Sequence, residues 1–380
     1  MRAAYITAYD SNDVSQWSGT GCYIARALEA QGIEFVRIGP LHRHIDPIII
    51  GKFLLNKALR LNYQRKRAPQ VLHRYAAEIA RRIEGLKLDF LFSPGTLEVS
   101  YLKTDIPIIF WTDCTFDGMV DFYPNMTSLA PETLRDGHAA EQAALTACRL
   151  AIYSSNWAAQ TALDHYKVDP AKVKVVPFGA NLVSSLKAED MPGLVAARGR
   201  DPARLLFVGV EWERKGGDYA VALLDNLLRL GVPAELTVVG CMPPDADRRP
   251  QVICRGFLSK NVPKELEELE RLFSAAHFLV IPSRAECFGV VAAEANLFGV
   301  PVLASDVGGF PDWIRAGRNG FCFPVHRFVE EATREILQLR KEPGAYEKLA
   351  LTAFAESSEH LTWPAVGREV KALIETALRD

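Results

Sequence analysis

The stretch PSRAECFGVVAAEANLFGVPVLASDVGG, residues 282–309, decides how the chain folds. It follows the short apolar run FLVI of residues 278–281, and a second such run, VLA, lies within it at residues 302–304. Between the two runs, VVAAEANLF of residues 290–298 is apolar on nearly every face, as a buried helix is. A strand, a helix and a second strand in this order predict a parallel βαβ unit.

Two carboxylates of this stretch lie where burial is expected. Glu286 is in the loop after the first strand, and Glu294 is inside the apolar helix. A buried carboxylate is costly unless it is hydrogen-bonded, so a backbone amide or an arginine is one expected partner for Glu294. The alternative is a ligand: Glu294 would accept hydrogen bonds from a ribose, and Glu286 would hold hydroxyls of a sugar. The backbone at the start of the helix would then bind phosphate through Cys287, Phe288, Gly289 and Val290.

Short apolar runs alternate with amphipathic stretches along both halves of the chain. At 380 residues the chain suits two domains, and the alternation predicts doubly wound α/β domains with parallel sheets. In the first half we expect strands at residues 2–8, 34–38, 89–92, 106–111, 150–153 and 173–177, with helices that include 20–31, 70–84, 131–147 and 156–166. In the second half we expect strands at 204–208, 234–239, 278–281 and 302–304, and helices at 218–230, 263–275 and 290–298.

The segment 180–202 loses this rhythm and gathers proline and glycine, which predicts domains at residues 1–182 and 183–362. The sequence after about Val325 has a helical pattern throughout. Asn156 is the expected N-cap of its helix, and Gly32 the expected stop of the helix before it.

A basic pair follows the first strand of the second half. Arg214 and Lys215 come directly before Gly216 and Gly217, at the opening of a helix. Parallel sheets bind ligands beyond the carboxyl ends of their strands, so two cations there suit a pyrophosphate, and the glycines would let backbone approach it. A solvated turn is the alternative.

The loop after the first strand of the chain contains Gly19, Thr20 and Gly21 at a helix start. This pattern fits either a phosphate-contacting loop or a simple tight turn. The third glycine of the dinucleotide-binding fingerprint is replaced by Ile24, and strand 34–38 does not end in an acidic residue. Both departures argue against a nicotinamide-dependent dehydrogenase.

Asp113 follows the strand IPIIFW and has two interpretations. It either orients an acceptor and stabilises positive charge on a reacting sugar, or it closes an Asx turn. Nearby aromatic side chains suggest an aromatic floor for an acceptor, with core packing as the alternative for Trp111. The four are Trp17, Trp111, Phe116 and Tyr123.

Composition excludes several classes. The formal charge of −2, from 44 basic and 46 acidic residues, does not predict a nucleic-acid partner. The seven cysteines form no Cys-x-x-Cys pair and the histidines no His-Glu-x-x-His unit, so no metal site is expected.

No signal peptide or membrane-spanning run is recognised, and we expect a cytoplasmic protein. The basic segment 52–82 is either a solvated surface or a site of peripheral contact with the inner face of an anionic membrane.

The motif of Glu286 and Glu294 with Phe-Gly between them, followed by GVPVLASDVGG, resembles the retaining glycosyltransferases of family 4. The resemblance extends over essentially the whole chain and is most specific over residues 282–309. It implies the GT-B fold, in which two Rossmann-like domains face each other across a cleft, and a final helix, 363–380, that packs back on the first domain.

The resemblance also implies an activity. A hexosyl unit would pass from a nucleotide diphosphate sugar to a glycan, glycolipid or small-molecule acceptor, without metal or cofactor, in cell-envelope or other glycan biosynthesis. Arg214 and Lys215 would neutralise the leaving diphosphate, Glu286 would hold the sugar, and Glu294 the ribose. Where many relatives have a histidine, this chain has Asp113. A covalent intermediate on Asp113 or Glu286 is the alternative mechanism.

Other functions remain open at this point. A nucleotide-sugar epimerase, a phosphorylase or a non-catalytic sugar-nucleotide sensor would use the same fold. The segment QVICRGFL, residues 251–258, is the expected base pocket, but it does not distinguish one base from another.

Overall fold

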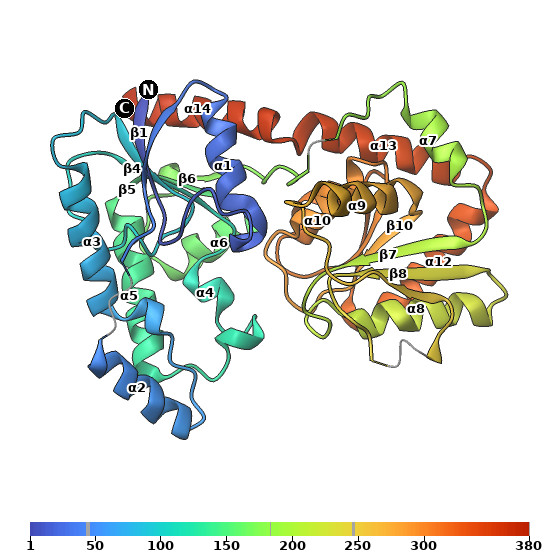
Figure 1. The fold of residues 1–380 in the computed structure, drawn as a ribbon, viewed down its shortest axis with the longest axis horizontal. Coiled ribbons are helices and arrows are strands. Elements are labelled where there is room, and N and C mark those ends of the chain that lie inside the picture. The colour runs from blue at the N-terminus through green and yellow to red at the C-terminus, as the bar shows by residue number, and fades with distance from the viewer. Residues whose placement is uncertain (43–45, 183, 245–247, 380) are drawn as a thin grey trace. The chain divides into compact units, whose positions relative to one another are not determined.

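The computed structural model describes residues 1–42, 46–182, 184–244 and 248–379. The chain divides into two compact units, Met1–Phe178 with Trp363–Asp380, and Gly179–Thr362 (Figure 1). Residue 183, the predicted start of the second domain, lies outside the described residues. Each unit contains a six-stranded sheet in which all strand pairs are parallel, so the predicted doubly wound α/β class is confirmed.

The sheet of the first unit has the strand order β2-β1-β3-β4-β5-β6. The chain winds from β1 to one side and then, after β2, to the other, so the switch point lies between β1 and β3. The strands are β1 (Arg2–Ile6), β2 (Glu34–Ile38), β3 (Phe90–Ser93), β4 (Ile108–Thr112), β5 (Cys148–Tyr153) and β6 (Val173–Val175).

The helices of the first unit include one from the far end of the sequence. The C-terminal helix α14 (Trp363–Arg379) lies along α1 (Thr20–Glu29), as Figure 1 shows in red and blue. Gly367 permits this close packing, because a Cβ there would lie 3.1 Å from the carbonyl oxygen of Ala27. The other helices are α2 (Pro47–Ala58), α3 (Pro69–Ile83), α4 (Phe116–Met119), α5 (Pro131–Ala147) and α6 (Asn156–His165), with 3-10 turns at Gln16–Gly19, Arg65–Arg67, Pro124–Met126 and Pro170–Lys172.

The sheet of the second unit has the order β12-β11-β10-β7-β8-β9, with its switch point between β7 and β10. Helices α8 and α12 pack together against one face, around a core that contains Leu224, Val280 and Phe328. The strands are β7 (Ala203–Val208), β8 (Ala234–Val239), β9 (Val252–Cys254), β10 (Phe278–Ile281), β11 (Val302–Ser305) and β12 (Gly320–Phe323). The helices are α7 (Met191–Ala197), α8 (Gly217–Arg229), α9 (Pro263–Ala275), α10 (Val290–Asn296), α11 (Phe310–Trp313), α12 (Phe328–Lys341) and α13 (Ala345–His360), with a 3-10 turn at Val325–Arg327.

Most element predictions hold to within a few residues, and the misses have local causes. The strands β9 and β12 were not predicted; they are three and four residues long and form the two edges of the second sheet. Asn156 as an N-cap is wrong, because the Ser155 hydroxyl accepts the cap hydrogen bond from the amide of Ala158 at 3.1 Å.

Three glycines stack the loops that follow β7, β8 and β9. The amide of Gly240 donates to the carbonyl of Gly256 at 2.7 Å. A Cβ at Gly240 would lie 2.6 Å from the carbonyl oxygen of Gly209, and Gly240 has φ +97°. These loops therefore approach backbone to backbone, and at Gly240 the spacing leaves no room for a side chain.

Candidate active site

The carboxyl ends of β7 and β10 flank the switch point of the second sheet, where doubly wound folds bind ligands. The loop after β7 contains Arg214 and Lys215, and the loop after β10 contains Glu286. The order of the strands thus brings the predicted basic pair close to the predicted carboxylate Glu286, although they are far apart in the sequence.

Both basic side chains contact one oxygen of Glu286. The Lys215 ammonium forms an ion pair with Oε2, and Nη1 of Arg214 lies 3.4 Å from the same atom. The Arg214 guanidinium also donates to the carbonyl of Ala285 at 2.8 Å and to the Glu211 carboxylate at 2.7 Å. Glu286 is 8% exposed, so its charge is compensated by two cations in a largely dry setting.

The glycines beside the basic pair have a packing role. A Cβ at Gly216 would lie 2.0 Å from the carbonyl oxygen of Pro282, and a Cβ at Gly217 would lie 2.2 Å from the Trp212 indole. Protein atoms therefore account for both glycines, and the approach of their backbone to a ligand stays a prediction. The two glycines lock the β7 loop onto the β10 loop, which fixes the basic pair against Glu286.

Glu294 has a basic partner that was not predicted. It is 2% exposed within α10, and its carboxylate forms an ion pair with Lys260 from the loop after β9. The expected structural partner of Glu294 was a backbone amide or an arginine, so the lysine corrects that expectation. The sequence signal was weak, because Lys260 lies two residues beyond the segment assigned to the base pocket.

Most of the side chains at the start of α10 are buried and therefore are not available to a ligand. The side chains of Cys287 and Phe288 are buried, and Phe288 stacks on Trp313 with ring centroids 5.1 Å apart. Gly289 has φ +77°, and a Cβ there would lie 2.2 Å from the Phe310 ring. Only Val290 of the four predicted residues has a partly exposed side chain. Any direct contact of Cys287 or Phe288 with a ligand would therefore involve the main chain.

Exposed apolar side chains lie on the same three loops that the glycines stack. Val210 follows β7, Met242 follows β8, and Phe257 follows β9; they are 61%, 65% and 68% exposed. Three exposed hydrophobic groups after adjacent strands are typical of a surface that a ligand covers.

In the first unit, Gly19, Thr20 and Gly21 begin α1 beyond the carboxyl end of β1. Gly19 is the N-cap residue with φ +85°, and Thr20 is buried. A Cβ at Gly21 would lie 2.1 Å from the Tyr9 hydroxyl, so this glycine is needed for packing. The tight turn, one of the two alternatives, occurs here, and contact of this loop with a phosphate stays a prediction.

Asp113 directly follows β4 and accepts a hydrogen bond from the Trp17 indole N–H at 3.3 Å. Trp17 and Ser18 have φ values of 48° and 54°, which cost about 1–3 kcal/mol each for residues other than glycine. The Trp17 ring also contacts Phe178 edge to face at 5.5 Å. A strained segment thus holds an aromatic donor against this carboxylate.

The proposed aromatic floor is wrong for two of its members. Trp111 is fully buried and donates to the carbonyl of Val176 at 3.0 Å. Phe116 is also fully buried, and its ring lies 4.4 Å from the Arg67 guanidinium. Beside them, burial raises the pKa of the Glu141 carboxyl and lowers the pKa of Arg67. These aromatic rings belong to the core.

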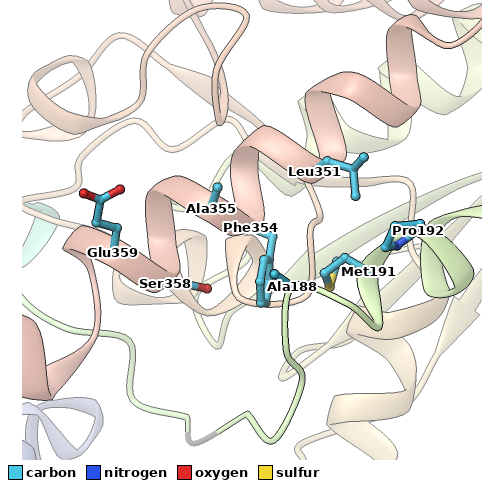
Figure 2. A pocket seen from close by; sticks show the side chains of 8 residues that line it. All are labelled: Ala188, Met191, Pro192, Leu351, Phe354, Ala355, Ser358 and Glu359. Atoms are coloured by element: carbon cyan, nitrogen blue, oxygen red, sulfur yellow. The ribbon is translucent and has the colours of Figure 1, made fainter.

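A separate apolar pocket of about 480 Å³ lies between α7 and α13 (Figure 2). Its lining includes Met191, Leu351 and Phe354, and none of the predicted site residues. Over the described ranges, no three histidine, cysteine or acidic side chains are grouped as metal ligands. No helix in the same part of the chain is long and apolar enough to span a bilayer.

Comparison with known proteins confirms the resemblance. Residues 202–342 match the family described as Glycosyl transferases group 1. A D-inositol 3-phosphate glycosyltransferase of Streptomyces bingchenggensis (strain BCW-1) is 33% identical over 229 residues, covering 57% of this chain and 50% of that protein. The enzyme of the same name from Streptomyces scabiei (strain 87.22) is 37% identical over 179 residues, covering 43% and 40%. The chain spans about half the length of these curated relatives.

Solved structures confirm the predicted GT-B fold over the full length. Sucrose-phosphate synthase from Thermosynechococcus elongatus superposes with a TM-score of 0.71 at 17% identity, covering 100% of this chain and 99% of the other. WaaG, a glycosyltransferase involved in lipopolysaccharide biosynthesis, gives 0.64 at 16% identity, covering 98% and 99%. HepE of Anabaena, solved with UDP and glucose, gives 0.62 at 14% identity, covering 99% of each chain.

Proposed function

We propose that this chain, whose residues 202–342 match the group 1 glycosyl transferases, moves a hexosyl unit from a nucleotide diphosphate sugar to an acceptor hydroxyl with retention of configuration. The acceptor would be a glycan, a glycolipid or a small molecule. The observation that carries the proposal is the contact of Lys215 and Arg214 with Glu286 at the switch point of the second sheet. These are a cation pair for a diphosphate and a carboxylate for sugar hydroxyls, already side by side.

The proposed reaction breaks the bond between the anomeric carbon and the diphosphate oxygen. Both electrons of that bond leave with the diphosphate, and Lys215 and Arg214 stabilise the added negative charge. The acceptor hydroxyl forms the new bond on the same face of the sugar, and its proton passes to a phosphate oxygen. Glu286 orients the sugar through its hydroxyls, and no metal ion takes part.

The residues proposed to bind the ribose and the base of the donor are assigned from the chemistry of their side chains. Glu294 would accept hydrogen bonds from the ribose hydroxyls, and the ion pair with Lys260 would orient its buried carboxylate. Phe257 offers an exposed aromatic face on the same loop as Lys260, which suits stacking on the base. HepE binds UDP and glucose, which makes a uridine donor the first to test.

The first unit is the proposed acceptor side. Asp113 would stabilise positive charge on the sugar, and the backbone of Gly19, Thr20 and Gly21 would approach the donor phosphates. Its segment 52–82 is proposed to contact an anionic membrane at the cytoplasmic face, where a lipid-linked acceptor of the cell envelope would be found.

The first experiment measures thermal unfolding with a panel of nucleotides and nucleotide sugars, with and without EDTA. A ligand at about 100 times its Kd adds about 2.7 kcal/mol to the free energy of unfolding. Stabilisation by the diphosphate of one nucleoside, with a shift that EDTA does not change, supports the donor site and a metal-independent reaction. Absence of any shift, or equal affinity of wild type and Glu294→Ala, contradicts the donor assignment.

Acceptor screening with the stabilising donor then separates the alternatives. Release of nucleoside diphosphate that rises with an acceptor, with the donor's anomeric configuration retained in the product, supports transfer. Conversion of the donor to a second sugar isomer without acceptor would indicate an epimerase. Tight donor binding with no turnover would indicate a sensor.

A further inference from the structure

The helix α2 has an unusual concentration of exposed aliphatic side chains. Five of the twelve exposed large apolar residues in the described part of the chain lie on or directly after it, each between 37% and 68% exposed. We call them the α2 face: Ile48, Ile50, Leu54, Leu55 and Leu59. In Figure 1, α2 lies at the opposite end of the first unit from α14.

The opposite side of α2 already has a partner. Ile49 and Phe53 pack with Tyr63, Ala68 and Ala130 in a small core. The helix is therefore apolar on both sides, although only one side is covered by the described residues. Helices that are apolar all round are normally buried, so the α2 face is expected to have a partner outside this chain.

The charge around the α2 face narrows the choice of partner. Residues 47–77 contain seven lysines and arginines and no acidic residue. Lys57, Arg60, Arg65 and Lys66 are exposed, and the Arg65 guanidinium lies 4.6 Å from the Phe53 ring of α2. An aliphatic surface with a cationic border is typical of helices that lie in the interface of an anionic bilayer.

We propose that the α2 face inserts among the acyl chains of an anionic lipid bilayer, with Lys57, Arg60 and Arg65 against the headgroups. This inference rests on the proposed membrane contact of segment 52–82 and assigns that contact to one helix. A second copy of the chain fits less well, because pairing two such faces would bring their basic borders together. A nucleic acid would match the charge and leave the leucines and isoleucines exposed to water.

The test is sedimentation of the full chain with two kinds of vesicle: phosphatidylcholine alone, and equal parts of phosphatidylcholine and phosphatidylglycerol. Wild type is expected to bind the anionic vesicles, and less strongly as salt rises. The double variant Leu54→Ser/Leu55→Ser should lower the partition coefficient at least about tenfold. Lys57→Glu/Arg60→Glu should lower it by about tenfold or more and flatten its salt dependence.

Leu230→Ser is the matched control, since Leu230 is a leucine 48% exposed on the second unit, and it should bind as wild type does. Unfolding temperatures of all variants should match wild type, because the substituted side chains face solvent. Binding that the α2 variants leave unchanged, or no vesicle binding at all, overturns the inference. So does a dimer in the absence of lipid that Leu54→Ser/Leu55→Ser dissociates, which would assign the face to a second copy.

The outcome is separable from that of the transfer reaction. Nucleotide-induced thermal stabilisation in the absence of lipid reports on the proposed donor site, which includes no residue of the α2 face, and should be equal in wild type and the α2 variants. Vesicle binding without nucleotide response would contradict the transfer proposal only, and nucleotide response without vesicle binding would contradict only the membrane inference.

Discussion

The carboxyl ends of the two sheets hold their carboxylates in different ways. In the second sheet, Glu286 and Glu294 are each paired with lysine in tightly packed loops. In the first sheet, Asp113 accepts a hydrogen bond from a neutral indole on a strained backbone. Ion pairs in tightly packed loops suit the proposed nucleotide sugar on the second sheet, and a hydrogen-bond donor on a strained segment suits the proposed acceptor side on the first.

The largest effect should come from Glu286→Gln. We expect kcat to fall by about a thousandfold, because the carboxylate would contact the reacting sugar in the transition state. Nucleoside diphosphate release measures it. Glu211→Gln is the matched control: Glu211 also accepts from Arg214, but its side chain is 57% exposed, and kcat should stay within about twofold. Equal losses in the two variants would mean that both carboxylates merely position Arg214.

Lys215→Met should lower kcat about a hundredfold and change the donor Kd much less, since charge on the leaving diphosphate grows as the bond breaks. Steady-state kinetics and calorimetric titration separate the two quantities. A loss confined to Kd would show that Lys215 binds donor and transition state equally.

Breaking the second ion pair should affect stability. Lys260→Met leaves the buried Glu294 carboxylate without its cation, and we expect a loss of about 2 kcal/mol in the free energy of unfolding. Adding Glu294→Gln should recover most of that loss, because the residual charge is then removed. Chemical denaturation of Lys260→Met, Glu294→Gln and the double variant measures this coupling. If the losses in free energy of unfolding of the two single variants simply add in the double variant, the two side chains are not energetically coupled.

Trp17→Phe should have the smallest effect. It removes the hydrogen bond to Asp113 while keeping a ring beside Phe178, and a neutral hydrogen bond contributes about 1 kcal/mol. We expect kcat/KM for the acceptor to change about fivefold, with donor Kd unchanged. A change in donor Kd as large as that of Glu294→Ala would remove the contrast between the two edges.

The carboxyl edge of the second sheet left the clearer pattern in the sequence, although the edge strands β9 and β12 of that sheet were missed. Within one short stretch, Pro282 follows a strand, a carboxylate lies in the loop, and Glu294 lies in an apolar helix. The pairing with Lys215 followed from strand order, which doubly wound topology largely determines. Lys260 left no such pattern, because a lysine after a three-residue edge strand is common on any surface.

The first sheet was harder to interpret because its features depend on tertiary packing. Nothing in the sequence marks Trp17 and Ser18 as left-handed, since both residues ordinarily avoid that conformation. Phe116 was assigned to a ligand surface, but Gly137 lets its ring enter the core: a Cβ there would lie 2.2 Å from that ring. The membrane hypothesis rested on the basic residues of segment 52–82. The apolar side chains of the α2 face, which support it further, were identified only because the structure shows that they are exposed.

The stacked loops of Gly209, Gly240 and Gly256 bear on how this protein could be redesigned. Inserting or deleting a residue in one of these loops would disturb the other two, so grafting single loops from relatives is a poor route to a new donor. The exposed side chains of Val210, Met242 and Phe257 stand on that fixed platform and can be exchanged without moving it. If the proposed donor site is right, a combinatorial library at these three positions would change base preference while the loop backbone stays the same.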